Sequence, residues 1–253
     1  MEQLKHSLEV EHVTKTFYSS SGYFTAVEDV SFSLNDGEFL VILGPGRCGK
    51  TVLLNMIAGI EEKSGGSITY KGQEKTGVDP DFGMVFQSLA LMPFKTVMEN
   101  VELPLKLRGV KKEERRKVAQ HYIELVGLQG FEKSYPHQLS GGMKQRVGIA
   151  RAYTSNPKVL IMDEPFGQLD AQTRYSMQNE ILRIWEAERR TVIFVTNNIE
   201  EACYLGDRII LLSDCPATVK ETYTIDLPRP RDMVSDEFLR IRTMISDNTD
   251  LAI

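Results

Sequence analysis

The sequence predicts an α/β fold with a mainly parallel sheet covered by helices on both faces. Short apolar runs alternate along the chain with longer segments of helical spacing, a pattern typical of parallel sheets. One apolar run is followed at once by a glycine loop and a helical segment. The 253 residues are 42% hydrophobic, which is enough for a large core.

The predicted strands are short runs that either alternate in polarity or are apolar throughout. They are residues 8–17, 25–34, 37–43, 68–70, 82–86, 159–162, 191–195 and 208–212. Glycines bound the apolar run EFLVIL, so we expect this strand to be buried.

Segments with apolar residues three or four positions apart predict helices. They are residues 50–59, 111–126, 141–153 and 171–188, and a further amphipathic helix begins at Ser235. We interpret the charge run KKEERRK at the start of the second helix as a solvated face. The stretch PRPR at 228–231 marks the start of a short tail, which we expect to pack on the core.

Composition excludes several classes of protein. A net charge of −5 and a pI near 5.5 argue against nucleic acid or an anionic lipid surface as the main partner. Three cysteines without CxxC spacing make a disulfide framework or a zinc knuckle an unfavourable interpretation, and a reducing cytosol fits best. We identify no signal peptide and no apolar span of about 18 residues, so we expect any membrane role to act through a partner.

The glycine loop GPGRCGKT matches the phosphate-binding pattern GxxxxGK[ST], between a predicted strand and a predicted helix. Its residues are Gly44, Pro45, Gly46, Arg47, Cys48, Gly49, Lys50 and Thr51. Backbone N–H groups of such a loop surround phosphates, Lys50 reaches the β and γ oxygens, and the Thr51 hydroxyl ligates Mg²⁺. Cys48 is a small space-filling residue in this interpretation, because no histidine base is near it in sequence.

The segment VLIMDE places two carboxylates at the carboxyl end of a buried strand, where parallel folds bind ligands. We expect Asp163 to hold Mg²⁺ and Glu164 to act as a general base toward water. The alternative is a strand end that meets a helix N-terminus, where acids are favoured anyway.

The segment LSGGMKQR places Ser140, Gly141 and Gly142 directly before a predicted helix. Ser140 can cap that helix, and the two glycines let an anion approach the backbone N–H groups. The simpler alternative is a capped helix after a turn.

Together these motifs resemble the ATP-binding subunit of an ABC transporter, over about residues 8–230. LSGGMKQR resembles the family signature, VLIMDE its Walker B strand and GMVFQSLALMPFKTVMENV its Q-loop region. The resemblance implies a P-loop NTPase cassette with a mainly parallel core sheet, an N-terminal antiparallel β subdomain, and a signature-bearing helical subdomain at about 88–155. Residues 231–253 would be a short tail.

The resemblance also implies roles for single residues. Gln87 would contact Mg²⁺ and the γ-phosphate and, with 88–97, link them to a membrane subunit; Phe17 would stack on adenine, and Asp170 lies in the D-loop segment FGQLDAQTR. Two cassettes would pack head to tail, with ATP between the phosphate loop of one and the signature of the other. In isolation Gln87 could be a solvated loop residue and Phe17 a core residue, and Tyr18 is close enough to be confused with Phe17.

The segments FGQLDAQTR and DLPRPRD are similar to sequences in nitrate, sulfonate and taurine importers. We also expect no long C-terminal regulatory domain. The resemblance implies a small anion as cargo, transmembrane permease subunits and an extracytoplasmic substrate-binding protein as partners, and a peripheral position on the cytoplasmic face of the membrane. Two other classes stay open: a nucleotide-gated module with little turnover, and an ABC protein of translation or DNA repair, although the long insertions or second cassette of the latter are not seen.

Two residues depart from the family pattern. Asn197, in Thr196-Asn197-Asn198, stands where the family has its switch histidine. Its amide can donate to a phosphate oxygen but is neutral and cannot shuttle a proton, so we expect slower hydrolysis or a partner cassette that keeps the histidine. Arg47 stands where glycine is common, and we expect an ordinary loop conformation for it.

Overall fold

The computed structural model describes residues 7–20, 22–88 and 90–249, so Leu89 of the Q-loop region and both chain ends lie outside the described residues. The chain divides into two compact units. The first unit consists of Met1–Asp79 with Thr191–Ile253, and the second of Pro80–Arg190.

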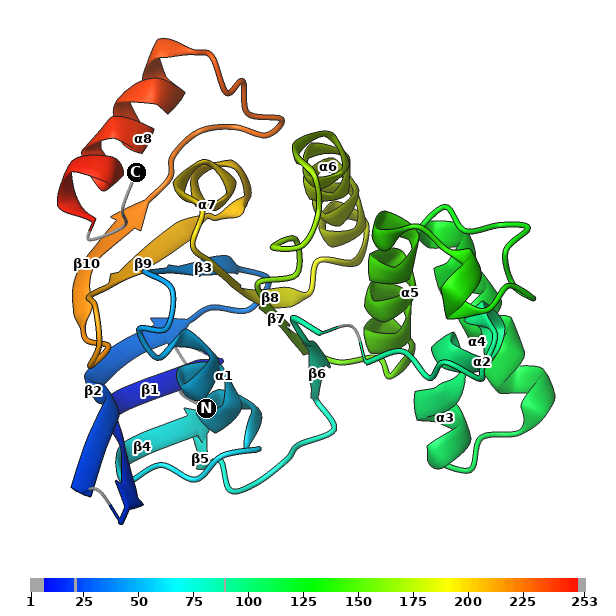
Figure 1. Ribbon diagram of the computed structural model, residues 1–253, viewed down its shortest axis with the longest axis horizontal. Helices are drawn as coiled ribbons and strands as arrows, with labels where there is room; N and C mark the ends of the chain where they lie inside the picture. Colours follow the sequence, from blue (N-terminus) through cyan, green and yellow to red (C-terminus); the bar gives the residue numbers. More distant parts are fainter. Residues whose placement is uncertain (1–6, 21, 89, 250–253) are drawn as a thin grey trace. The chain divides into compact units, whose positions relative to one another are not determined.

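An antiparallel sheet forms one layer of the first unit (Figure 1). Its strands are β1 (Leu8–Ser19), β2 (Gly22–Leu34), β4 (Gly65–Tyr70) and β5 (Gln73–Glu74), in the order β2-β1-β4-β5. Each neighbouring pair is antiparallel. The N-terminal antiparallel sheet, which only the family resemblance implied, is confirmed.

A mainly parallel sheet forms the core of the first unit. Its strands are β3 (Phe39–Leu43), β8 (Thr191–Thr196), β9 (Arg208–Leu212) and β10 (Val219–Thr224). β3 lies between β8 and β9 and is parallel to both, while β10 pairs antiparallel with β9. All residues of β3 and β8 are buried, as the continuous apolar runs predicted.

Three helices cover parts of this unit. α1 (Lys50–Ala58) ends at Gly59, which has a φ of 78° and a left-handed conformation. α7 (Ile199–Leu205) lies over β3, and α8 (Asp236–Asn248) lies beside β10 (Figure 1). α8 buries Phe238 and Ile245, and its Asn248 donates to Glu221 and to the Tyr223 hydroxyl, both of β10, at 2.7 and 2.8 Å. The tail therefore packs on the first unit.

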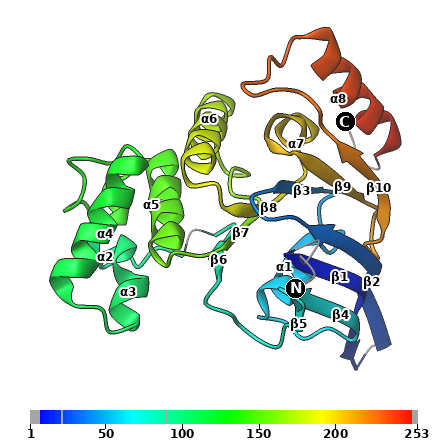
Figure 2. The same cartoon turned by 180° about the vertical axis from the view of Figure 1, so that it is seen from behind.

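The second unit combines a parallel strand pair with helices. β6 (Phe82–Val85) pairs with β7 (Val159–Asp163). The helices are α2 (Val97–Val101), α3 (Leu103–Leu107), α4 (Lys112–Leu125), η1 (Pro136–Gln138), α5 (Gly141–Thr154) and α6 (Ala171–Glu188). Figure 2 shows α2, α3 and α4 grouped beside α5. The fully buried Val101, Ile123 and Val147 join these helices in an apolar core.

The charge run at the start of α4 is exposed, with one exception. The Arg115 side chain is largely buried and its Nε lies 3.0 Å from Oε2 of the buried Glu102. The prediction of a solvated face therefore fails at Arg115, because a buried carboxylate requires a partner.

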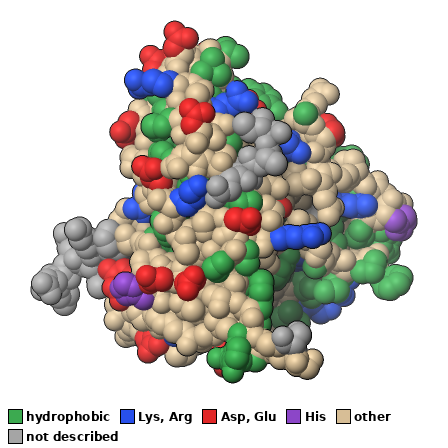
Figure 3. All heavy atoms as spheres, turned by 60° about the vertical axis from the view of Figure 1, so that its left-hand side comes forward, with side chains coloured by type: hydrophobic (Ala, Val, Ile, Leu, Met, Phe, Trp, Pro, Cys, Tyr) green, Lys and Arg blue, Asp and Glu red, His purple; other side chains and the backbone are tan. Residues whose placement is uncertain are grey.

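Charges of both signs are interspersed on one face of the molecule. Figure 3 shows Lys and Arg side chains scattered among Asp and Glu side chains over the face that it presents. None of the helices in the described ranges combines the length and the apolar character that crossing a bilayer requires.

Candidate active site

The phosphate loop lies between the end of β3 and the start of α1, in the order that the sequence predicted. Gly49 has a φ of 119°, and a Cβ on it would lie only 2.4 Å from the Ala26 carbonyl oxygen. A Cβ on Gly46 would meet open space, so this part of the loop is accessible from outside. The loop leads into the N-terminus of α1, where the helix carries a partial positive charge that favours a phosphate.

Lys50 is the buried cation of the loop, with 3% of its surface exposed. Its Nζ donates to the carbonyl oxygens of Gly44 at 2.9 Å and Pro45 at 2.6 Å. Thr51 follows it on α1 and is exposed, so its hydroxyl can reach a ligand. The loop thus offers an ammonium, a hydroxyl and backbone N–H groups within eight residues.

Cys48 is fully buried beneath the loop. A Cβ on Gly44 would lie 3.1 Å from its Sγ. Burial raises the pKa of this thiol, so the reactive thiolate is disfavoured. The thiol therefore fills space, as the sequence interpretation held.

The expectation of an ordinary loop conformation for Arg47 is wrong. Its φ is 65°, in the left-handed region that only a small fraction of residues other than glycine adopt. Successive N–H groups point to one side where a left-handed residue follows a right-handed one. The left-handed conformation of Arg47 suits such a turn, although the residue is not glycine. The Arg47 residue is exposed, so its side chain meets no packing constraint.

Asn197 lies next to the phosphate loop, because Leu43 at the end of β3 is in register with Thr196 at the end of β8. The Gly44 N–H donates to the Thr196 carbonyl at 3.4 Å. Beyond this point Asn197 is exposed, as its expected role near phosphate requires.

The turn that carries Asn197 is built by its neighbours. The Thr196 hydroxyl donates to the Glu201 carboxylate and accepts from the Asn198 N–H at 3.0 Å. Asn198 caps α7 by accepting from the Glu201 N–H at 2.9 Å. These residues were not predicted from the sequence, although Asn followed three positions later by Glu is a recognisable helix start.

Phe17 and Tyr18 differ in their surroundings on β1. Phe17 is half-buried, pairs across the strands with Phe24, and has the Lys15 Nζ 4.8 Å from its ring centroid. Tyr18 is 73% exposed and makes an edge contact with Tyr23 at a ring separation of 4.8 Å. Because alternate residues face opposite sides of a strand, Phe17 continues the side of the buried Lys15.

In the second unit the structure brings Gln87 and Glu164 together. Gln87 follows β6 and Glu164 follows β7, and the Gln87 Nε2 donates to the Glu164 Oε2 at 3.4 Å. Asp163 is the last residue of β7 and is buried. Glu164 has a φ of 41°, and such strained backbone is concentrated at functional sites.

The signature residues lie where two helix N-termini meet. Ser140 caps α5 by accepting from the Met143 N–H at 3.3 Å, as predicted, and Asp170 caps α6 by accepting from the Thr173 N–H at 3.0 Å. The latter contact lowers the pKa of the Asp170 carboxyl. A Cβ on Gly142 would lie 2.8 Å from the Thr173 Cγ2, so glycine permits this close approach. Ser140 and Gly141 are exposed beside a cavity of about 400 Å³.

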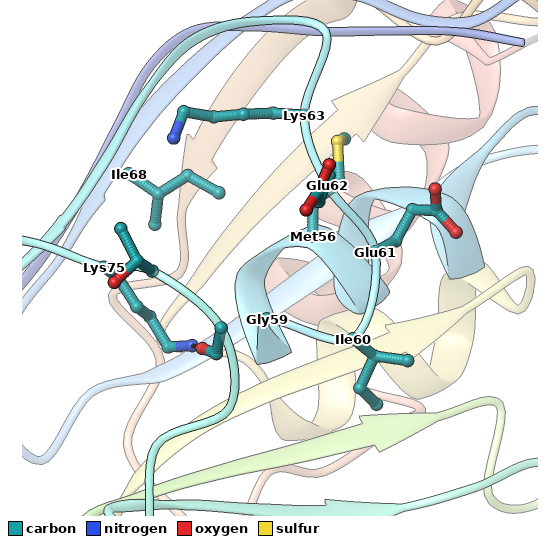
Figure 4. Close-up of a pocket in the computed structure, with 10 residues that line it drawn as sticks. Met56, Gly59, Ile60, Glu61, Glu62, Lys63, Ile68 and Lys75 are labelled. Carbon is teal, nitrogen blue, oxygen red and sulfur yellow. Dashed lines mark hydrogen bonds between the residues drawn. The ribbon is translucent and has the colours of Figure 1, made fainter.

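A second cavity of about 400 Å³ lies at the far end of α1, away from the phosphate loop (Figure 4). Its cations are engaged within the protein. The Lys63 Nζ lies 3.1 Å from the Glu74 carboxylate, and the Lys75 Nζ donates to the Gly77 carbonyl at 2.6 Å. None of the residues predicted for the site lines this cavity.

Each unit carries groups that suit Mg²⁺ or nucleotide phosphates. The Thr51 hydroxyl of the first unit is a hard oxygen ligand of the kind that Mg²⁺ prefers, and so are the Asp163 carboxylate and the Gln87 amide oxygen of the second unit. The buried Lys50 and the glycine loop are suited to the phosphates.

Known proteins are similar to this chain in sequence. Residues 27–167 match the sequence model of the ABC transporter family. An uncharacterized ABC transporter ATP-binding protein of Methanocaldococcus jannaschii is 46% identical over 244 residues, which cover 96% of this chain and 91% of that protein. A nitrate import ATP-binding protein of Synechococcus elongatus is 41% identical, with coverage of 95% and 90%. An aliphatic sulfonates import ATP-binding protein of Bacillus anthracis is 39% identical, with coverage of 94% of each chain.

Solved structures agree. A dimeric ATP-binding cassette in a post-hydrolysis state, bound to ADP and Pi, superposes with a TM-score of 0.76 at 32% identity, over 87% of this chain and 100% of that chain. The chain therefore belongs to the ABC transporter family, whose ATP-binding subunits are ATPases that use ATP and Mg²⁺.

Proposed function

We propose that this chain is the ATP-hydrolysing cassette of an importer for a small anion such as nitrate, a sulfonate or taurine. One observation carries the proposal: the register of β3 and β8 brings the Asn197 turn next to the phosphate loop. The relatives named for nitrate and sulfonate import support the importer and the anionic cargo.

In the first unit, the phosphate loop binds the β and γ phosphates. Lys50 leaves the carbonyls of Gly44 and Pro45 to neutralise phosphate charge, and Thr51 supplies a hydroxyl ligand to Mg²⁺. Phe17 provides the aromatic face for adenine. Asn197 donates an N–H to the γ-phosphate from its fixed turn.

In the second unit, Asp163 and Gln87 offer oxygen ligands, and Glu164 is the general base that orients the attacking water and accepts its proton. The contact between Gln87 and Glu164 supports a shared function, because the Gln87 amide donates a hydrogen bond to the Glu164 carboxylate. Mg²⁺, when bound, neutralises the charge that develops on the transferred phosphoryl group.

A second surface that suits a phosphate supports dimerisation. Ser140, Gly141 and Gly142, with Asp170 nearby, present two adjacent helix N-termini that attract an anion. We propose that this surface clamps the ATP held by the phosphate loop of another cassette, in a homodimer or a heterodimer. Residues 1–230 form the cassette, with the helical subdomain at about 88–155, and 231–253 form the tail.

Exposed apolar side chains of the second unit support docking of a permease. Phe94 is 91% exposed and Met92 and Leu107 are also exposed, a combination that commonly marks an interaction surface. We propose that the cassette sits peripherally on the cytoplasmic face of the membrane, where residues 88–97 link it to the permease. An extracytoplasmic substrate-binding protein would deliver the anion.

Asn197 favours a second candidate, a degenerate cassette of low turnover whose partner retains the histidine. A cassette with Asn197 keeps a neutral hydrogen-bond donor but lacks a side chain that can shuttle a proton. Such a cassette would hold ATP longer between turnovers.

The test is purification of the complex from the native membrane with this chain tagged. The proposal predicts that a hydrophobic permease copurifies and that Glu164→Gln removes most ATP hydrolysis. Equal ATPase rates with and without Glu164→Gln would contradict it. A second cassette species with a switch histidine would favour the second candidate.

A further inference from the structure

Two arginines of the segment DLPRPRD, which leads into the tail, bind the C-terminal end of α7. Arg231 is 6% exposed, and its Nη1 donates to the carbonyl oxygens of Cys203, Tyr204 and Gly206 at 2.7, 3.2 and 2.7 Å. The Arg229 Nη2 donates to the carbonyl of Leu205. Four successive carbonyls at the end of the helix thus accept hydrogen bonds from two guanidinium groups, which together we call the arginine clamp.

The arginine clamp is itself anchored in the first unit. Arg231 also donates to the carbonyls of Ile225 and Leu227, both at 3.2 Å, and the Arg229 Nη1 lies 2.5 Å from the Asp207 carboxylate. Asp207 in turn accepts from the Phe39 N–H of β3 at 2.9 Å. The clamp therefore connects the tail, the end of α7 and the strand that leads into the phosphate loop.

Burying a guanidinium group costs free energy unless hydrogen bonds compensate it, and the carbonyls around Arg231 supply these bonds. Burial lowers the pKa of Arg231 to about 10, and the group stays protonated at neutral pH. The carbonyls at the end of a helix carry partial negative charge and lack partners within the helix, so they are suitable acceptors for a cation.

α7 needs such a support because it has only seven residues. Helices shorter than about 12 residues are marginal in water and depend on tertiary contacts. At its other end α7 is capped by Asn198, which directly follows Asn197, and Glu201 in its first turn binds the Thr196 hydroxyl. With a rise of about 1.5 Å per residue, the arginine clamp acts about 10 Å from the Asn197 turn.

We propose that Arg231 and Arg229 are positioning residues for Asn197: they fix α7 and thereby hold the Asn197 turn beside the phosphate loop. This inference rests on the proposed function of Asn197 as a donor to the γ-phosphate. The two arginines would thus affect ATP hydrolysis, although they contact the end of α7 that lies opposite the Asn197 turn.

The first test is kinetic and uses the full chain. Arg231→Lys keeps the charge but loses the fork that reaches several carbonyls, and the exposed Arg240→Lys of α8 is the matched control. We expect Arg231→Lys to lower kcat about fivefold to tenfold with an unchanged KM for ATP, and Arg240→Lys to change neither. In an Asn197→Ala background, Arg231→Lys should lower kcat further by less than about twofold.

The second test does not require turnover. Amide hydrogen exchange of the apo protein should be faster across 197–205 in Arg231→Lys than in Arg240→Lys, with exchange of β3 unchanged. Unchanged exchange at 197–205, or an equal loss of kcat in the wild-type and Asn197→Ala backgrounds, overturns the inference. If the wild-type chain shows no ATP turnover, the proposed function fails, and the exchange result alone decides whether the arginine clamp positions the turn.

Discussion

Replacement of Asn197 by histidine restores the side chain that the family pattern has at this position, and the structure can accept it. Asn197 is exposed and its φ is not positive, so histidine needs no change of backbone. The hydrogen bonds that build the turn belong to Thr196, Asn198 and Glu201. Exposed substitutions of this kind change stability by less than about 0.5 kcal/mol, so an effect on the rate will not reflect unfolding.

The size of the effect follows from the two donors. An amide that donates to a phosphate oxygen already makes a hydrogen bond with one charged partner, whereas a protonated imidazole adds a Coulomb attraction of about 1 kcal/mol at about 4 Å in water, and more in a less polar site. The difference of about 1–1.5 kcal/mol corresponds to a rise in kcat of about fivefold to tenfold, provided that it is expressed in the transition state. Because histidine titrates near pH 6.5, the gain should be larger at pH 6.5 than at pH 8.5.

The assay is steady-state ATP hydrolysis by the purified complex, with kcat and KM measured at both pH values. Glu164→Gln, alone and combined with Asn197→His, is the control, and it should abolish the gain. A kcat for Asn197→His equal to or below that of the wild type would refute the assignment of Asn197 to the γ-phosphate.

Three further outcomes are expected. Glu164→Gln should lower kcat by about 10²- to 10⁴-fold while ATP affinity, measured by calorimetry, stays within about threefold; a tenfold loss of affinity would contradict the role of base. Gly142→Ala should destabilise the chain by about 1–3 kcal/mol in thermal melting, because its Cβ would lie 2.8 Å from the Thr173 Cγ2, and Thr173→Ser should recover most of this loss. Glu99 and Thr96 share reciprocal hydrogen bonds that lower the pKa of the Glu99 carboxyl. The ionised carboxylate therefore stabilises the fold above the pKa that Glu99 has in the unfolded chain, and this stabilisation is lost as the pH falls through the pKa of the folded state. The stability advantage of the wild type over Glu99→Gln should thus shrink in acid, and a constant difference from pH 7 to pH 3 would count against it.

The apolar strands and long helices could be predicted because local pattern and burial agree in them. The run at 39–43 is buried along its whole length, and α6 has the bounds that its periodicity predicted. β10 was not predicted, because VKETYT is polar and pairs only as an exposed antiparallel edge strand. α7 is too short for periodicity to identify it.

The chemistry of single residues was predicted where a motif fixes it, and missed where a long-range contact does. The capping role of Ser140 follows from its position before a helix, and the structure has that contact. The left-handed conformation of Arg47 could not be predicted, since arginine gives no local signal for it. The contacts of Arg231 with α7 span 25 to 28 residues and leave no trace in local spacing.

We expect ATP to join two cassettes through the phosphate loop of one and the signature of the other. Light scattering of the Glu164→Gln chain, with and without ATP and Mg²⁺, tests it most directly, with Gly141→Asp in the same background as the control, because a carboxylate there repels the nucleotide phosphates. The mass should double with ATP, and Gly141→Asp should abolish this doubling while ATP binding to each chain persists. A chain that binds ATP yet keeps its monomer mass, or a dimer that Gly141→Asp leaves intact, would contradict it.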